Sequence, residues 1–257
     1  AKILNNFSKK NGIIFNSTPF SFEECDFLVN ELKVPFIKVA SMDLNNFPLL
    51  EHFAKKKLPI LLSTGMSSLK EIKEAVKTIN KAGNKKIIIL HCVSIYPTPL
   101  NKINLNRINE LKKIFTKNFV GFSDHSLGSH HSITAINLGV KIIEKHFTVD
   151  QTMEGWDHKV SILPNDLKNL TEYASNYQKS LGKKKIIQVE SKKIKIAFRR
   201  SIVAKKIIER GSVLTKSDLT FKRPGDGMDP KFFNTLIGKK TKKKIFYDQQ
   251  LSLKDIF

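Results

Sequence analysis

The sequence predicts an α/β protein: a parallel sheet closed as a (β/α)₈ barrel, followed by a small β-rich domain. Three observations lead to this prediction. Short apolar runs alternate with amphipathic stretches over the first 150 residues, a polar residue ends each run, and the composition changes after about residue 182. We therefore expect a partial barrel domain over 1–182, a linker over 183–195 and a small domain over 196–257.

Six runs have the composition of buried parallel strands, which are nearly continuous in apolar residues when helices cover the sheet. In chain order they are 12–18 (GIIFNST), 35–41 (PFIKVAS), 58–64 (LPILLST), 86–92 (KIIILHC), 119–124 (FVGFSD) and 140–147 (VKIIEKHF).

The stretches between these runs are typical of helices. In 67–84, one helical face carries Leu69, Ile72, Val76 and Ile79, and a glycine follows at the position that ends many helices. In 21–34, Ser21 followed by Glu24 has the form of a capping box that opens a helix. The order β-α-β-α predicts a parallel sheet, either doubly wound or closed as a barrel.

Polar residues at the strand ends favour the barrel. A doubly wound sheet binds its ligand at one switch point, whereas a closed barrel gathers the ends of all strands around one mouth. All six runs end in polar side chains, so we predict a TIM barrel, although a complete one needs eight βα units. These side chains are Thr18, Lys38, Ser41, Ser63, Thr64, His91, Ser123, His125, Glu144 and His146.

Composition excludes some other classes of protein. The 257 residues are 40% hydrophobic, enough for a full core, and no apolar run approaches the roughly 20 residues that span a bilayer. The chain start has no signal-peptide core, so we expect a cytoplasmic protein without membrane contact. Cys25 and Cys92 lack metal-finger spacing and are expected to be reduced core residues.

The net charge of +22 raises the possibility of nucleic-acid binding. However, only 5 of the 45 basic residues are arginine, and the lysines are spread over the chain in short runs that apolar residues interrupt. We therefore favour a solvated basic surface, which would still attract small anions. A lysine-rich nucleic-acid binder remains an alternative.

Two histidines are candidate metal ligands. His125 and His146 lie 21 residues apart, one βα unit, so neighbouring strand ends can direct both imidazoles to one point. Glu144 precedes the second histidine by two residues, and strand alternation turns both side chains to the same face. His130 and His131 are expected to open the following helix.

Six segments and the C-terminal part of the chain together resemble the N-acetylneuraminate (sialic acid) synthase family, which includes legionaminic and pseudaminic acid synthases. The segments are STPFS (17–21), IKVASMDLNNFPLL (37–50), ILLSTGMSSLKEI (60–72), LHCVSIYPTP (90–99), GFSDHSLG (121–128) and IIEKHFTVD (142–150). Residues 198–230, which contain the turn KRPGDG, are similar to the antifreeze-like (SAF) domain of that family.

The resemblance implies a reaction. Members of this family condense phosphoenolpyruvate with N-acetylmannosamine or a related acylamino sugar, giving a nine-carbon 2-keto acid and phosphate. They use a divalent metal, commonly Mn²⁺, with Mg²⁺ or Co²⁺ as alternatives, and work as domain-swapped homodimers. The acceptor sugar is not determined by these motifs.

The resemblance also implies roles for individual residues. His125 and His146 correspond to the metal ligands, and Glu144 and Asp157 to acidic groups near the metal and sugar. Residues expected at the substrates are Thr18, Lys38, Ser63, Ser94, Tyr96 and Ser123, with Arg223 of the small domain on the acyl group of the sugar. Two positions differ from the family pattern, because Ser94 stands where asparagine is common and Trp156 where proline is frequent.

The family barrel has two βα units before the first run of this chain. We therefore expect either a fragment of a longer gene product or a truncated paralogue. In both cases the 257-residue chain should be poorly active or inactive, and an inactive paralogue would serve as an interaction module. An enzyme should be stabilised by manganese and phosphoenolpyruvate, whereas a nucleic-acid binder should show salt-sensitive retention of RNA or DNA.

Overall fold

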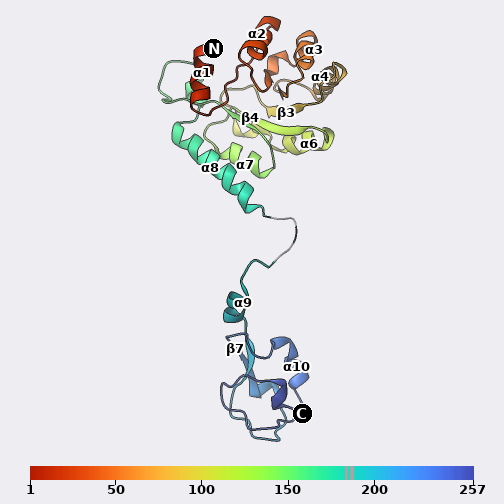
Figure 1. Ribbon diagram of the computed structural model, residues 1–257, viewed down its shortest axis with the longest axis vertical. Helices are drawn as coiled ribbons and strands as arrows, with labels where there is room; N and C mark the ends of the chain where they lie inside the picture. Colours follow the sequence, from red (N-terminus) through yellow and green to blue (C-terminus); the bar gives the residue numbers. More distant parts are fainter. Residues whose placement is uncertain (183–184, 186–187) are drawn as a thin grey trace. The chain divides into compact units, whose positions relative to one another are not determined.

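The computed structural model describes residues 1–182, 185 and 188–257, which form two compact units, Ala1–Gly182 and Lys183–Phe257 (Figure 1). The strands of the first unit are β1 (Ile37–Val39), β2 (Ile60–Ser63), β3 (Ile87–Cys92), β4 (Phe119–Asp124) and β5 (Ile143–Lys145). Its helices are α1 (Lys2–Lys10), α2 (Phe22–Asp26), α3 (Phe47–Lys55), α4 (Leu69–Lys81), α5 (Leu100–Ile103), α6 (Asn106–Ile114), α7 (His130–Asn137) and α8 (Pro164–Ser180).

The strands of the first unit form one parallel sheet in the order β1-β2-β3-β4-β5. Each strand therefore pairs with the next strand along the chain, as the alternation of strands and helices predicts. The register places Cys92, Ser123 and Glu144 side by side on β3, β4 and β5. The carboxyl ends of neighbouring strands thus meet at one edge of the sheet.

Alternate residues of the strands pack against the helices, because successive side chains of a strand point to opposite faces. The strand residues in this core are Ile37, Val39, Ile60, Leu62, Ile87, Ile89, Val120 and Phe122, which join apolar side chains of α3, α4 and α6. The residues between them, such as Lys38, Ser63 and Ser123, belong to the inner face, and there they line a pocket at the strand ends.

Helix α4 forms where its apolar stripe predicts it. Ser68 caps its start, because the hydroxyl accepts a hydrogen bond from the Glu71 backbone N–H and the Glu71 carboxylate accepts one from the Ser68 backbone. Ile72 and Ile79 are completely buried against the sheet. Gly83 has φ +87°, a left-handed conformation that glycine adopts without strain, and it ends the helix.

The sheet is curled, and a contact between its two edge strands shows this directly. Lys38 comes from β1 and Glu144 from β5, at opposite ends of the strand order, yet Lys38 Nζ lies 3.4 Å from Glu144 Oε2. A flat sheet of five strands would hold its edge strands about 19 Å apart. The first unit is therefore an α/β fold built on a parallel half-barrel.

The prediction of a strand at 12–18 is wrong, because this segment forms no ladder with β1 or with any other strand described in the structure. Ile13 and Ile14 are 64% and 69% exposed. Phe15 instead packs against a cluster in and just after the π-helix that follows α2, formed by Leu28, Leu32 and Val34. An apolar run of this length has the composition of a strand. Without a neighbouring strand to pair with, however, its backbone N–H and C=O groups form no ladder of hydrogen bonds.

The start of α2 differs slightly from the predicted capping box. The Ser21 hydroxyl accepts a hydrogen bond from the Glu24 backbone N–H, as expected. The Glu24 carboxylate, however, accepts from the backbone N–H of Phe20, 2.6 Å away, one residue before the predicted partner. Both bonds still satisfy backbone donors at the helix start.

The second unit is small and β-rich. Its helices are α9 (Lys192–Phe198) and α10 (Phe233–Leu236), and β6 (Ser201–Ala204) pairs antiparallel with β7 (Leu219–Lys222). Isolated bridges, such as Val203 with Gln250, tie further segments to this pair. Its separate core contains Ile202, Leu214, Leu236 and Ile245.

The predicted linker, 183–195, is only partly described. Residues 183–184 and 186–187 lie outside the described residues. Residues 192–195 begin helix α9, whose start is capped by the Ser191 hydroxyl accepting from the Ile194 backbone N–H. The sequence does not predict this helix, because it is short and its lysines give the stretch the composition of a charged linker.

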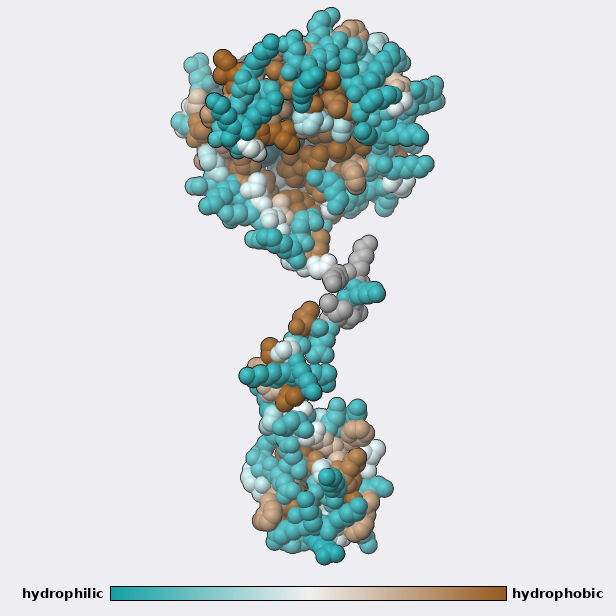
Figure 2. All heavy atoms as spheres, viewed as in Figure 1, coloured by the Kyte–Doolittle hydropathy of each residue, from teal (hydrophilic) through white to brown (hydrophobic). Residues whose placement is uncertain are grey.

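The surface is largely hydrophilic. On the face of the first unit seen in Figure 2, hydrophobic residues gather in the middle and hydrophilic residues surround them. Within the described ranges, no helix has the length and apolar character needed to cross a membrane.

Candidate active site

A pocket of about 480 Å³ lies at the carboxyl ends of the strands of the half-barrel. Its walls come from all five strands, β1 to β5, and the loops that follow them, because the curl brings these strand ends together. Most of the residues predicted for the site line this pocket, namely Thr18, Lys38, Ser63, Ser94, Tyr96, Ser123, His125, Glu144 and His146.

A chain of polar contacts crosses the floor of the pocket. The Ser123 hydroxyl donates to Glu144 Oε1 at 2.6 Å, and Glu144 Oε2 receives the Lys38 ammonium at 3.4 Å. The side chain of Lys38 is only 12% exposed, so its charge is directed into the pocket. A cation and a carboxylate thus face the same cavity, fixed by three different strands.

Ser63 carries an unused hydrogen-bonding group. The residue is only 2% exposed, and its buried hydroxyl oxygen has no hydrogen-bond partner among the described residues. A buried polar group without a partner loses its hydration without compensation. Because Ser63 lines the pocket, a polar ligand there would supply the missing bond.

His125 and His146 face each other across the pocket, with ring centroids 5.4 Å apart. His125 Nδ1 lies 2.8 Å from the Val93 carbonyl oxygen, which accepts its proton. That bond fixes the tautomer, so Nε2 keeps its lone pair toward the pocket. There it lies 3.2 Å from the Tyr96 hydroxyl, whose ring stacks on the imidazole at 4.1 Å.

The surroundings shift the pKa values of these groups. Burial lowers the pKa of His146, and the nearby Asp157 only partly opposes this, so the imidazole stays neutral to lower pH than usual. Burial also lowers the pKa of His125, but the Cys92 sulfur at 3.9 Å and the Val93 carbonyl outweigh it and leave a raised pKa. Burial raises the pKa of Tyr96 to about 12, with help from the negative groups around it.

Asp157 lies at the rim of the site. Its Oδ2 is 3.8 Å from His146 Nδ1, while its own side chain is 63% exposed. Trp156, at the position that differs from the family pattern, is 97% exposed and contributes nothing to the pocket wall. His158 is bonded to the Thr148 hydroxyl at 2.7 Å, away from the pair of histidines.

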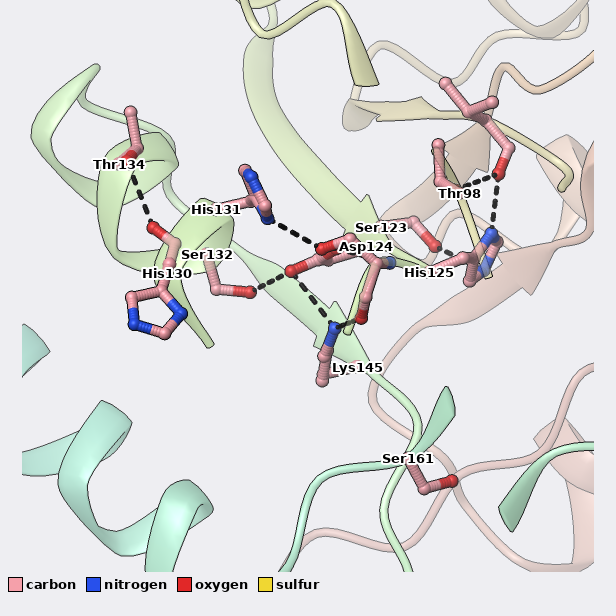
Figure 3. A network of polar contacts seen from close by, with 12 residues as sticks. Thr98, Ser123, Asp124, His125, His130, His131, Ser132, Thr134, Lys145 and Ser161 are labelled. Carbon is pink, nitrogen blue, oxygen red and sulfur yellow. Dashed lines mark hydrogen bonds and ion pairs between the residues drawn. The ribbon is translucent and has the colours of Figure 1, made fainter. Parts of the chain in front are cut away.

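A buried ion pair precedes the two histidines in sequence, and Figure 3 shows its members, Asp124 and Lys145, facing each other. Asp124 precedes His125, Lys145 precedes His146, and the two form a register pair of β4 and β5 with side chains 3.2 Å apart and at most 3% exposed. Asp124 also accepts from the Ser126 backbone and from the hydroxyls of Ser126 and Ser132. Lys145 in turn donates to the Ser126 carbonyl, so this network fixes the register of the two strand ends.

Two neighbouring histidines stay outside the pocket. Figure 3 shows His130 at the start of α7 with its ring turned away from Asp124 and Lys145. His131 is half-buried, and its Nδ1 lies 2.9 Å from the Ser126 hydroxyl. Both open the helix that follows β4, as predicted.

One strand-end prediction is wrong. His91 does not point to the barrel mouth but into the helical layer, where it is completely buried, stacks on Phe122 and bonds to the Ile103 carbonyl at 2.7 Å. Leu90 and Cys92 take the inner positions of β3, because side chains alternate along the strand. The apolar sequence around His91 does not reveal which phase this alternation has.

Six pocket residues were not among the predicted site residues, and three of them, Ser41, Cys92 and Lys145, carry a polar or charged group or a thiol. Ser41 accepts a hydrogen bond from the Gly65 backbone N–H at 3.0 Å, and Cys92 lies 3.5 Å from the Ser41 hydroxyl. Lys145 reaches the same pocket. Ser41 follows Lys38 by three residues at a strand end, a signal that was available in the sequence, whereas nothing in the sequence distinguished Lys145 from the other lysines.

A second group of possible metal-binding side chains lies on the helical layer. Cys25, Asp26 and His52 place their ligand atoms within 4.8 Å of one another. Asp26 already pairs with His52 Nε2 at 2.7 Å and with the Lys56 ammonium. Burial raises the pKa of the Cys25 thiol to about 11. The group therefore contains a neutral thiol, and the Lys56 ammonium already pairs with its carboxylate.

Arg223 belongs to the second unit. It lies in the turn after β7, where its guanidinium stands over the Phe198 ring at 5.0 Å from the centroid. The residue is exposed, and its guanidinium is a cation.

Comparison with known proteins gives two domain matches. Residues 1–186 match the NeuB family, and residues 199–256 match the SAF domain.

Curated relatives and a solved structure match over most of the chain. The N,N'-diacetyllegionaminic acid synthase of Campylobacter jejuni is 43% identical over 236 residues, which cover 90% of this chain and 70% of the relative. The N-acetylneuraminate-9-phosphate synthase of Homo sapiens is 35% identical over 240 residues, covering 92% and 66%. The crystal structure of N-acetylneuraminic acid synthetase from Leptospira borgpetersenii in complex with citrate has a TM-score of 0.69 and 37% identity, covering 76% of this chain and 67% of that one.

Proposed function

Because the chain belongs to the NeuB family and continues into a SAF domain, we propose that it condenses phosphoenolpyruvate with an N-acylated amino sugar. The products are a nine-carbon 2-keto acid of the sialic acid type and phosphate. The relatives, which are synthases of legionaminic and N-acetylneuraminic compounds, support this reaction class. The observation that carries the proposal is one pocket that joins a buried lysine, an unpaired buried hydroxyl and two facing imidazoles.

In this proposal Lys38, Thr18, Ser63 and Ser123 bind the phosphate and carboxylate of phosphoenolpyruvate. Lys38 supplies a cation whose solvent is largely removed, which strengthens its attraction for an anion. Ser63 gains the hydrogen-bond partner that it lacks, so the ligand relieves an existing cost instead of adding one. Ser94 and Tyr96 border the same site.

His125 and His146 would hold a divalent metal, for which Mn²⁺ is the first choice and Mg²⁺ or Co²⁺ are alternatives. The donor set fits: one imidazole has its tautomer fixed by the Val93 carbonyl, and burial favours the neutral form of the other. When bound, such an ion acts as a Lewis acid on the aldehyde of the open-chain sugar.

The steps proposed at phosphoenolpyruvate are those that the family resemblance implies. Its C3 attacks the aldehyde carbon, which forms the new C–C bond and leaves positive character at C2. Water adds at C2, and the tetrahedral intermediate expels phosphate by C–O cleavage. In this proposal Glu144 accepts a proton and orients the sugar hydroxyls, which is supported by its contacts with Ser123 and Lys38 in the pocket. Asp157 is proposed for the sugar side of the same site.

Further parts of the proposal rest on the sequence and on the family resemblance. They are a complete (β/α)₈ barrel, a cytoplasmic location, a domain-swapped homodimer and a contact between Arg223 and the acyl group of the sugar. Size-exclusion chromatography with light scattering tests the dimer, and Arg223→Lys combined with acceptors of different acyl length tests the contact.

The proposal is tested by ligand-dependent thermal stabilisation of the full chain. Mn²⁺ and phosphoenolpyruvate should each raise the midpoint, because a ligand at about 100 times its Kd stabilises the folded state by about 2.7 kcal/mol. His125→Ala should abolish the Mn²⁺ effect, while the matched control His130→Ala, at an exposed ring nearby, should keep it. Phosphate release from phosphoenolpyruvate, measured with a panel of N-acylated hexosamines, identifies the acceptor.

Two results would contradict the proposal. One is a Mn²⁺ effect of the same size in His125→Ala and in the unchanged chain. The other is salt-sensitive retention on RNA or DNA that is unaffected by His125→Ala, in the absence of any response to phosphoenolpyruvate, because that outcome supports the nucleic-acid alternative.

A further inference from the structure

The second unit contains a cationic cavity whose lining includes none of the residues that have a role in the proposed reaction. It measures about 450 Å³ and is lined by Lys192, Lys195, Arg199 and Arg200, together with the turn at 225–230. Figure 1 shows α9, which carries the two lysines, beside β7 of the same unit. The cavity therefore combines four positive charges from one short stretch of chain with a wall from another.

These cations lack the partners that other cations of the unit have. Elsewhere in the unit, ion pairs of 2.5–2.8 Å join Lys206 to Asp218, Lys222 to Asp248, Lys243 to Asp255 and Lys244 to Glu209. None of the four cavity cations has a carboxylate within 4.0 Å in the part of the chain that the structure describes.

One carboxylate does line the cavity, but it is already used. Asp229 Oδ1 accepts the Lys231 backbone N–H at 2.9 Å and caps the short helical turn that follows. A guanidinium nitrogen of Arg200 donates to the Phe221 carbonyl at 3.0 Å, which leaves the rest of its donors unassigned. The lining is therefore strongly positive and rich in free donors.

The frame of the cavity is fixed by the backbone. The Gly225 N–H donates to the Ile196 carbonyl at 2.7 Å, and the Ser201 hydroxyl donates to the Pro224 carbonyl at 2.7 Å and accepts from the Gly227 N–H. A Cβ at Gly225 would stand 2.5 Å from Arg199 Cβ and 2.9 Å from its carbonyl carbon, so only glycine permits this approach. A fixed frame lowers the entropic cost of gathering the cations around a ligand.

We infer that this cavity binds a small molecule that bears a phosphate group. Guanidinium groups match phosphate oxygens with paired donors, lysines add charge, and the volume suits a small metabolite. A concave site lined by four cations fits a compact dianion better than a nucleic-acid strand, which needs an extended basic groove. The inference does not depend on the proposed reaction, because this cavity and the pocket of the first unit share no lining residue.

The test is a titration of the ¹⁵N-labelled full chain with inorganic phosphate, followed by amide resonances at constant ionic strength. The amides of Gly225 and Gly227 and the Arg199 side chain should shift and saturate. In Lys195→Gln/Arg199→Gln the affinity should fall about tenfold or more, since two charge-assisted contacts are lost. Lys240→Gln/Lys254→Gln removes the same charge from exposed positions outside the cavity and should leave the affinity unchanged.

The same spectra report whether each variant is folded, so a folding failure cannot imitate a loss of binding. The inference is overturned if the cavity amides do not saturate, if sodium chloride produces the same shifts, or if the cavity variant binds phosphate as well as the control. It is also overturned if citrate saturates the cavity and phosphate does not, or if only an oligonucleotide binds and shifts resonances across the unit.

Discussion

Replacement of Lys145 by methionine should strongly destabilise the first unit. The change leaves Asp124 buried and charged without its cation, while the volume of the side chain is nearly kept. Breaking a buried pair by removing one partner costs about 3–5 kcal/mol. Asp124 retains three hydrogen-bond donors, from the backbone and hydroxyl of Ser126 and from the Ser132 hydroxyl, so we expect the lower end, about 3 kcal/mol.

Scanning calorimetry measures this loss, because it separates the transition of the first unit from that of the smaller second unit. For a unit of this size, about 3 kcal/mol lowers the midpoint by about 6–12 °C. Lys141→Met, at an exposed lysine four positions earlier, should change it by less than about 2 °C. The double variant Asp124→Asn/Lys145→Met should recover part of the loss, since no buried charge is left alone.

A midpoint of Lys145→Met within about 2 °C of the unchanged chain would refute the argument. So would a double variant that loses as much as the sum of its two single changes, because the pair would then be uncoupled.

Three further outcomes follow from the structure. Burial lowers the pKa of His91, so as the pH falls the unfolded chain takes up a proton on this residue before the folded chain does. The free energy of unfolding should therefore fall as the pH drops below about 6.5. In His91→Gln, which keeps a donor for the Ile103 carbonyl, urea unfolding should show a smaller fall. Gly121→Ala should cost about 1–3 kcal/mol, measured by urea unfolding, because the new Cβ would lie 2.8 Å from the Ile142 carbonyl oxygen; an unchanged midpoint would contradict this. Lys38→Met should lower the apparent affinity for phosphoenolpyruvate in thermal titrations at least about tenfold. An equal loss of affinity in Lys73→Met, the control at an exposed lysine, would point to a general charge effect.

The sequence predicts much of the first unit, because periodicity and strand order are local properties. The stripe of Leu69, Ile72, Val76 and Ile79 predicts α4, although Leu69 itself is 40% exposed. The spacing of one βα unit between His125 and His146 places both on adjacent strand ends, and in the structure their rings face each other.

Other features depend on information that a single segment does not carry. The run at 12–18 has strand composition but no paired neighbour among the described residues, and His91 lies on the opposite face of β3 from the pocket. The role of Lys145 depends on its register with Asp124. The two residues lie on β4 and β5, and the pairing of these strands is set by the whole sheet. The cations of the second unit come together only because α9 folds back on the turn at Gly225.

The contact between Lys38 and Glu144 has a consequence for the order in which the protein acquires its pocket. About a hundred residues of sequence separate the two side chains, so their meeting is one of the most non-local events in the first unit. The floor of the pocket is complete only when the intervening strands have all taken their places. Loosening of either edge strand should therefore abolish ligand binding well before helical content declines, and amide exchange in β1 and β5 should slow down when a ligand occupies the floor.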